Sequence, residues 1–331
     1  MLCAVTGASG FVGSYLISQL VSQGHKVRAL VREPGAQAGS KNSLPGKAVD
    51  VRMGDVVQSS DLSSVFEGTE VVFHLAARIS ISRYDGGAVL DTNIGGTKNV
   101  LAACQKAGVR RLIHMSSVHA IDSAQSRMPM DENSPRVTSS AGPAYDLSKA
   151  TAEQEVLFGG HTDLETVVLS PSGIMGPFDH APSRIGRTLI DMARGRFPMV
   201  PTGRYNFVDV RDVVGAAIAA VDKARPGEKY LVTGEVASVR QLHDWVCEAG
   251  GSKPPGWNVP LRLLMPVARV AESFAHYTGR SPLLTPQSLE ILENPCEFSF
   301  EKARQELGYA PRSLKQSVAD SLDWFRAHGL L

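Results

Sequence analysis

Near its amino terminus the chain reads Thr6-Gly7-Ala8-Ser9-Gly10-Phe11-Val12-Gly13, and this stretch decides the fold. Apolar residues 2–5 precede it, as in a buried parallel strand, and apolar residues recur with a helical period over residues 12–21. Glycines let a backbone turn sharply and approach a pyrophosphate, while the amino terminus of the next helix presents N–H donors to it. The stretch therefore predicts a strand, a phosphate-binding turn and a helix, with glycines spaced three apart.

Strands and helices alternate through the first half of the chain. Helical periods predict two long helices, at residues 87–107 and 144–159, and apolar runs predict further strands. These strands cover residues 27–32, 48–53, 71–77, 111–117 and 164–169. Such alternation is typical of an α/β fold, so we predict a Rossmann-type doubly wound parallel sheet with a smaller, mostly helical C-terminal substrate lobe.

The composition excludes several classes of partner. The 331 residues are 43% hydrophobic and 20% charged, and a net charge of +1 indicates neither a nucleic acid nor an anionic membrane as partner. The four cysteines lie far apart without Cys-x-x-Cys spacing, so we predict no metal site. No apolar run is long enough to span a bilayer and no signal peptide fits before the first strand, so we expect a cytoplasmic protein.

Arg32 ends the second predicted strand, where chains of this fold reach the adenosine ribose of a dinucleotide. An acid there accepts hydrogen bonds from the ribose hydroxyls of NAD, whereas an arginine accommodates the 2′-phosphate of NADP. Arg32 therefore favours NADP, with NAD as the alternative and a solvated strand-end charge as the interpretation without a ligand. After the third strand, Asp55 either binds the adenine amino group or only closes a turn.

Tyr145 and Lys149 are four residues apart, so they share one face of the helix predicted at residues 144–159. An ammonium favours a neighbouring phenolate, and we expect it to bring the tyrosine pKa from about 10 toward neutrality. Ser117, at the end of the fifth predicted strand, can donate a hydrogen bond to the same substrate oxygen. The three residues predict proton transfer to or from a carbonyl or alcohol oxygen, while Ser116 leaves the choice of serine open.

Together these motifs resemble the extended short-chain dehydrogenase/reductase family, the superfamily of NAD-dependent epimerases and dehydratases. The resemblance covers residues 1–231 well and the remainder loosely. It implies hydride transfer at the nicotinamide, with Tyr145 as acid/base, Lys149 also holding the nicotinamide ribose and Ser117 polarising the substrate oxygen. The residues that carry it are Gly7, Ala8, Ser9, Gly10, Phe11, Val12, Gly13, Asp55, His74, Leu75, Ala76, Ala77, Asn93, Gly96, Thr97, Ser117, Tyr145 and Lys149.

The resemblance also implies a set of cofactor-binding residues at the strand ends. They are Gly7, Ser9, Gly10, Phe11, Val12, Gly13, Arg32, Asp55, Val56, Leu75, Ala76, Ala77, Asn93, Tyr145, Lys149, Pro171 and Ser172.

After Pro171 the alternation weakens, and glycine and proline become frequent. We therefore predict an NAD(P)-binding Rossmann domain over residues 1–170, to which residues 205–232 return. Residues 171–204 and 233–331 then form a substrate-binding lobe. Within this half, we expect a helix at residues 213–221 capped by Asp212 and a strand at residues 229–232, followed by helices that are broken at Pro254, Pro266, Pro286 and Pro311.

Three positions favour a ketone or alcohol reductase over an enzyme acting on nucleotide sugars. The family's dehydratases have an Asp-Glu pair where this chain has Val118-His119. Sugar-nucleotide enzymes of the family usually place Asn after the sixth strand, where this chain has Ser170-Pro171-Ser172-Gly173, and a diphosphate-binding Arg where it has Tyr205. The strand at residues 27–32 resembles that of dihydroflavonol 4-reductases, which use NADP; the 3β-hydroxysteroid dehydrogenases are a related branch.

We therefore predict an NADP-dependent oxidoreductase that reduces the ketone or aldehyde, or oxidises the alcohol, of a medium-sized and fairly apolar small molecule. The alternatives are a nucleotide-sugar 4-epimerase or dehydratase with bound NAD, and a non-catalytic NADP-binding regulator. The resemblance allows a homodimer through the two long helices, whose apolar faces could equally be core. Candidate substrate-facing residues are Arg78, Ser80, His119, Asp122 and Met175.

Two histidines and one aspartate have specific interpretations. His74 lies inside an apolar strand, which predicts a hydrogen-bonded core residue rather than a catalyst. His119 is either a second proton relay or, as we favour, a solvent-facing loop residue. Asp122 stands where dihydroflavonol reductases commonly have Asn, which argues against a flavonoid substrate.

Overall fold

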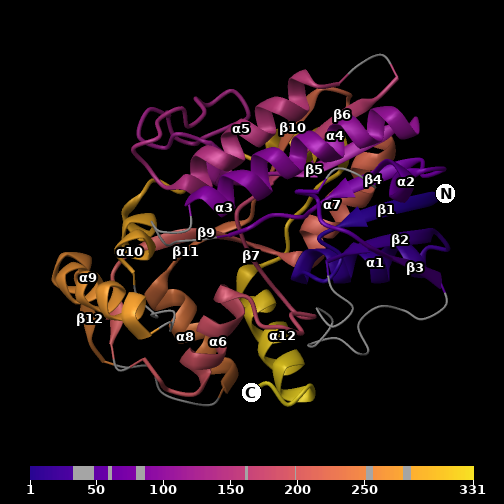
Figure 1. Ribbon diagram of the computed structural model, residues 1–331. Helices are drawn as coiled ribbons and strands as arrows, with labels where there is room; N and C mark the ends of the chain where they lie inside the picture. Colours follow the sequence, from indigo (N-terminus) through magenta and orange to yellow (C-terminus); the bar gives the residue numbers. More distant parts are fainter. Residues whose placement is uncertain are drawn as a thin grey trace.

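A seven-stranded, wholly parallel sheet organises the chain in the computed structural model (Figure 1). The strand order is β10-β6-β5-β4-β1-β2-β3. From β1 the chain adds β2 and β3 on one side of the sheet and then β4, β5 and β6 on the other. In such sheets ligands bind at this switch point, beyond the carboxyl ends of the strands. The strands are β1 (Leu2–Thr6), β2 (Lys26–Val31), β3 (Val49–Met53), β4 (Val71–His74), β5 (Arg111–Met115), β6 (Glu165–Pro171) and β10 (Glu228–Val232). The structure describes residues 1–32, 48–58, 62–79, 86–160, 163–197, 199–250, 256–278 and 285–331.

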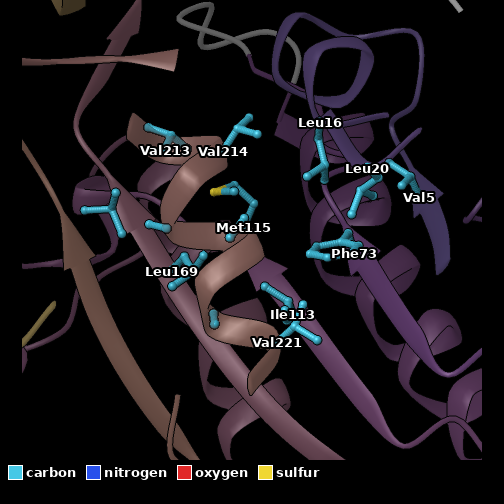
Figure 2. Close-up of a cluster of buried hydrophobic side chains, with 14 of the residues drawn as sticks. Val5, Leu16, Leu20, Phe73, Ile113, Met115, Leu169, Val213, Val214 and Val221 are labelled. Atoms are coloured by element: carbon cyan, nitrogen blue, oxygen red, sulfur yellow. The ribbon is translucent and has the colours of Figure 1, made fainter. Parts of the chain in front are cut away.

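Helices cover both faces of this sheet, which confirms the predicted α/β class (Figure 1). On one face α1 (Phe11–Ser22) packs beside α7 (Val210–Lys223), and their apolar side chains meet those of the central strands in the cluster of Figure 2. On the other face lie α2 (Leu62–Phe66), α4 (Gly96–Ala107) and α5 (Ala144–Phe158). Because both faces of the central strands β1, β4 and β6 are buried, these strands read as mostly apolar runs, whereas the edge strand β3 is largely exposed.

The helix predicted at residues 87–107 is interrupted. It consists of α3 (Gly86–Leu90), a π-helical turn at Asp91–Gly95 and then α4. The wide turn carries Asn93, whose side chain bonds across to the backbone of Arg78 and to Ser148. Gly96 follows at a close approach, since a Cβ there would lie 2.8 Å from a methyl carbon of Val56. These contacts with distant residues accompany the π-helical turn. The spacing of apolar residues in the sequence gives no sign of them, so the sequence does not predict the interruption.

The C-terminal half adds a smaller and mostly helical region with its own apolar core, as predicted. Its short strands form a three-stranded sheet and a two-stranded sheet: β11 (Glu235–Ser238), β9 (Arg204–Asp209) and β7 (Gly173–Met175), then β12 (Asn258–Val259) and β8 (Val200–Pro201). Its helices are α6 (Arg184–Ala193), α8 (Val239–Gly250), α9 (Leu261–Thr278), α10 (Pro286–Glu293) and α12 (Leu314–Ala327), while α11 (Glu301–Leu307) packs against α7 and β10.

Several local predictions need correction. Asp209, not Asp212, caps α7 by accepting a hydrogen bond from the Arg211 amide at 2.8 Å. Pro266 lies inside α9 instead of breaking a helix. Pro286 begins α10, because a proline at the first helical position lacks only an N–H that has no partner there. Pro254 lies outside the described residues.

The four cysteines are free and buried. Within the described ranges we find no helix that is long and apolar enough to cross a membrane. The same part of the chain contains no cluster of three or more His, Cys, Asp or Glu side chains arranged to hold a metal ion.

Candidate active site

The glycine turn between β1 and α1 is built so that side chains are excluded. Gly7 has a φ of +70°, and a Cβ on it would lie 2.7 Å from the Ala76 nitrogen at the end of β4. A Cβ on Gly13 would overlap the carbonyl oxygen of Gly7, and the Gly10 amide donates to that same oxygen at 3.0 Å. Among the described residues no side chain caps the amino terminus of α1, so its first N–H groups are available to an anion.

The two serines after β5 face different partners. Ser116 donates through Oγ to Oε2 of the buried Glu153 at 2.9 Å. Ser117 caps the next short helical turn, accepting from the His119 amide at 3.2 Å, and lies close enough to Tyr145 to lower the pKa of its phenol against the effect of burial. Of the pair left open by the sequence, Ser117 is the one that meets the tyrosine.

Tyr145 and Lys149 lie on the face of α5 that meets the ends of the central strands. Burial raises the pKa of Tyr145 to about 12; its hydrogen bond to Ser117 opposes the rise and the charge of Asp146 adds to it. Burial lowers the pKa of Lys149 to about 8, and the Lys149 ammonium donates to the Met115 carbonyl at 2.8 Å. Our expectation that Lys149 brings the tyrosine pKa toward neutrality is wrong for this structure, because burial dominates.

Asn93 and His74 form a buried polar support beneath these groups. Asn93 accepts from the Arg78 amide at 2.7 Å and donates to Ser148 of α5 at 2.8 Å. His74 is fully buried between hydroxyls of Thr6 and Thr97, at 2.7 and 3.0 Å. Its prediction as a hydrogen-bonded core histidine is confirmed.

The remaining cofactor candidates lie along the carboxyl edge of the sheet. Arg32 is exposed, directly after β2. Asp55 closes a turn by accepting from the Val57 amide at 3.0 Å. The buried Oγ of Ser172 has no hydrogen-bond partner within the described part of the chain. This unpaired hydroxyl and the glycine cradle fit a bound dinucleotide, whose phosphates and hydroxyls need such partners. Val56, Leu75, Ala76, Ala77 and Pro171 complete this edge at the ends of β3, β4 and β6.

The substrate candidates differ in where they lie. Arg78 is exposed at the end of β4, and Ser80 lies outside the described residues. The Asp122 carboxylate accepts from the Ala124 amide and the Gln125 side chain, so it folds back into its own loop. Met175 is buried in the apolar core of the C-terminal region.

His119 is not the solvent-facing loop residue that we favoured. Its Nδ1 lies 3.1 Å from a carboxylate oxygen of Asp146, and its Nε2 lies 2.9 Å from the hydroxyl of Tyr205. Its ring also meets the Tyr145 ring edge-on, with centroids 5.7 Å apart. Sequence reasoning missed Asp146 as part of this site, although its position beside Tyr145 was the available signal.

These side chains form the polar side of a small pocket of about 50 Å³. Its other side is mostly apolar and comes from the loop after β5 and from the segment after α10. The lining residues are Val118, His119, Ile121, Ser123, Met130, Asp146, Tyr205, Ile291, Asn294, Pro295 and Phe298.

Comparison with known proteins agrees with this geometry. The sequence model of the NAD dependent epimerase/dehydratase family matches residues 3–233, more than half of the chain. The chain belongs to this family. Its members are NAD(P)-dependent enzymes, so the chain is an NAD(P)-dependent oxidoreductase or epimerase of the extended short-chain dehydrogenase/reductase type.

Individual relatives cover nearly the whole chain. Sterol demethylase protein B of Methylococcus capsulatus is 33% identical over 100% of both chains. A protein of Synechocystis sp. named a dihydroflavonol 4-reductase is 32% identical over 98% of this chain and 94% of its own. The crystal structure of gox2253 superposes with a TM-score of 0.84 and 34% identity, covering 100% of this chain and 99% of that one.

The predicted resemblance is thereby confirmed. Relatives named 3-beta-hydroxysteroid dehydrogenase also match, at 29% identity. The family typically uses NAD(P).

Proposed function

We propose that this family member is an NADP-dependent oxidoreductase that reduces a ketone or aldehyde, or oxidises the corresponding alcohol, on a medium-sized and largely apolar molecule. The observation that carries the proposal is that Ser117 acts on the phenol of Tyr145, with Lys149 one helical turn away. This group lies at the carboxyl edge of the sheet, on the same edge as the glycine turn. The domain division at residue 170 is part of the same proposal.

A nicotinamide cofactor supplies or accepts hydride when it is bound. The glycine turn at residues 7–13 and the amino terminus of α1 would hold its pyrophosphate. Arg32 would bind a 2′-phosphate, which favours NADP over NAD. Lys149 would hold the nicotinamide ribose, and Ser172, whose buried hydroxyl has no partner among the described residues, would also bind the cofactor.

Side chains of the protein supply the proton that the substrate oxygen receives. Because burial raises the pKa of Tyr145 to about 12, its phenol stays protonated at neutral pH. It can therefore give its proton to a carbonyl oxygen as negative charge develops there, and Ser117 can donate a second hydrogen bond to that oxygen. In the opposite direction Tyr145 must start as the phenolate, and the raised pKa leaves little phenolate at neutral pH in the absence of ligands.

The pocket supports a reductase rather than an enzyme of nucleotide sugars. Tyr205 stands where a diphosphate-binding arginine is expected, and its hydroxyl is committed to His119 at 2.9 Å. We propose that His119, Tyr205 and Asp146 meet the polar end of the substrate. The apolar wall that includes Met130 and Phe298 would meet the remainder.

The test is a panel of ketones, aldehydes and alcohols assayed with NADPH and NADP, with UDP-sugars as a second panel. We expect turnover in the first panel that Tyr145→Phe lowers at least about 100-fold while the NADPH dissociation constant stays within about threefold. Turnover of UDP-sugars with tightly bound NAD would replace this proposal with an epimerase. Normal NADPH binding without any turnover would replace it with a regulator.

A further inference from the structure

Glu153 is fully buried on α5, four residues after Lys149 on the same helical face. One of its oxygens, Oε2, accepts hydrogen bonds from Ser116 at 2.9 Å and from Ser170 at 3.3 Å. These two serines come from the ends of β5 and β6. The carboxylate therefore connects the ends of β5 and β6. Both ends carry candidate site residues, because Ser117 follows Ser116 directly and Ser172 lies two residues after Ser170.

The second oxygen of Glu153 meets two cations. Oε1 lies 3.0 Å from Nε of Arg136 and 2.9 Å from Nζ of Lys229, which is itself almost fully buried on β10. Two hydroxyls and two cations thus surround this carboxylate. Because each partner comes from a different segment, the arrangement also fixes the carboxylate in place.

The charge of Glu153 reaches Lys149. Burial lowers the pKa of the lysine, and the carboxylate opposes that fall. The other titratable groups whose charges act on Lys149 are the imidazoles of His74 and His114, while the phenol of Tyr145 belongs to the preceding turn of α5. Burial keeps both imidazoles neutral, and the phenol is protonated, so none of the three offsets the loss of hydration of the ammonium.

We propose that Glu153 is a positioning residue: its hydrogen bonds fix the strand ends bearing Ser117 and Ser172, and its buried carboxylate, one helical turn from Lys149, supports cofactor binding by that lysine. The inference rests on the proposed role of Lys149 in holding the nicotinamide ribose. It adds a residue that touches neither cofactor nor substrate and acts through the lysine and the neighbouring serines.

The experiment measures the NADPH dissociation constant by fluorescence between about pH 7 and about pH 10. In the wild type we expect affinity to fall as Lys149 loses its proton, and we expect Lys149→Met to remove this pH-dependent step. Glu153→Gln should move the midpoint of the step down by about one pH unit or more, because the ammonium loses its counter-charge. Glu153→Asp should restore most of the difference.

Two further variants separate this role from a merely structural one. The control is Glu155→Gln. Glu155 lies on the same helix but forms a partly exposed ion pair with Lys98, so this variant should leave the pH midpoint of NADPH binding unchanged. Glu153→Gln combined with Lys229→Met removes both members of a buried pair, so it should recover thermal stability without recovering the midpoint.

The outcomes are distinguishable. An unchanged midpoint in folded Glu153→Gln, or in the double variant if the single one does not fold, overturns the inference and leaves the proposed function intact. A wild-type pH profile in Lys149→Met contradicts the assigned role of Lys149 itself.

Discussion

The hydroxyl of Thr6 and Nδ1 of His74 lie 2.7 Å apart in the core, at the point where β1 enters the glycine turn. On the other side of the ring, Nε2 meets the hydroxyl of Thr97, which donates its proton to the Asn93 carbonyl. Nε2 must therefore carry the imidazole hydrogen, and Nδ1 accepts from Thr6. The Asn93 side chain in turn donates a hydrogen bond to Ser148 of α5. Buried hydrogen bonds therefore connect the glycine turn to the helix that carries Tyr145.

Replacing His74 by Leu should lower the free energy of unfolding by about 2–3 kcal/mol, because two buried hydroxyls lose their partner. Chemical denaturation measures the change. Thr97→Val removes one of these hydroxyls, so the double variant should lose less than the sum of the single losses. Strict additivity would contradict the shared hydrogen bond.

Acid should destabilise the protein through its buried histidines. Burial lowers the pKa of His74 to about 3, and burial, His74 and Lys149 hold that of His114 well below its ordinary value. Below about pH 6.5 these two histidines bind protons in the unfolded chain but stay neutral in the folded chain. The free energy of unfolding therefore falls with decreasing pH. Each histidine should contribute about 1.4 kcal/mol per pH unit.

Urea denaturation at about pH 7, 6 and 5 measures this slope. His114→Phe offers the matched variant, because neither ring nitrogen of His114 has a hydrogen-bond partner among the described residues. It should remove the contribution of one histidine, and a slope equal to that of the wild type would refute the assignment.

Two glycine-to-alanine changes should have opposite effects. Gly13→Ala places a methyl group on the Gly7 carbonyl oxygen, so it should disrupt the turn and abolish NADPH binding. Gly215 is exposed within α7, with nothing within 4 Å of its Cβ position, so Gly215→Ala should stabilise the protein by up to about 1 kcal/mol. Thermal melts with and without NADPH report both effects, and a Gly13→Ala protein that still binds NADPH would exclude the turn as its site.

Cofactor preference should depend on Arg32. Arg32→Ala should weaken NADPH binding about 10- to 100-fold while leaving NADH binding nearly unchanged, because only NADPH carries the 2′-phosphate. The control is Arg52→Ala on the neighbouring strand, where Arg52 is an exposed residue paired with Asp50. Equal losses for both cofactors, or tighter NADH binding by the wild type, would count against NADP as the preferred cofactor.

The sequence by itself determined the sheet, the glycine turn and the spacing of Tyr145 and Lys149. These features depend on local geometry: a strand followed by a glycine turn and a helix, or two residues one turn apart. Short strands such as β7 and β8 escaped prediction because two or three residues show no alternation.

Only the tertiary structure decided which serine meets the tyrosine and that His119 lies between Asp146 and Tyr205. It also decided that two serine hydroxyls and two cations surround Glu153. Each of these arrangements joins residues that are far apart in the sequence, with no periodicity to connect them. The high pKa of Tyr145 belongs to the same group, because it arises from burial. A spacing of four residues places an ammonium near a phenol, but the surrounding packing determines what that ammonium contacts.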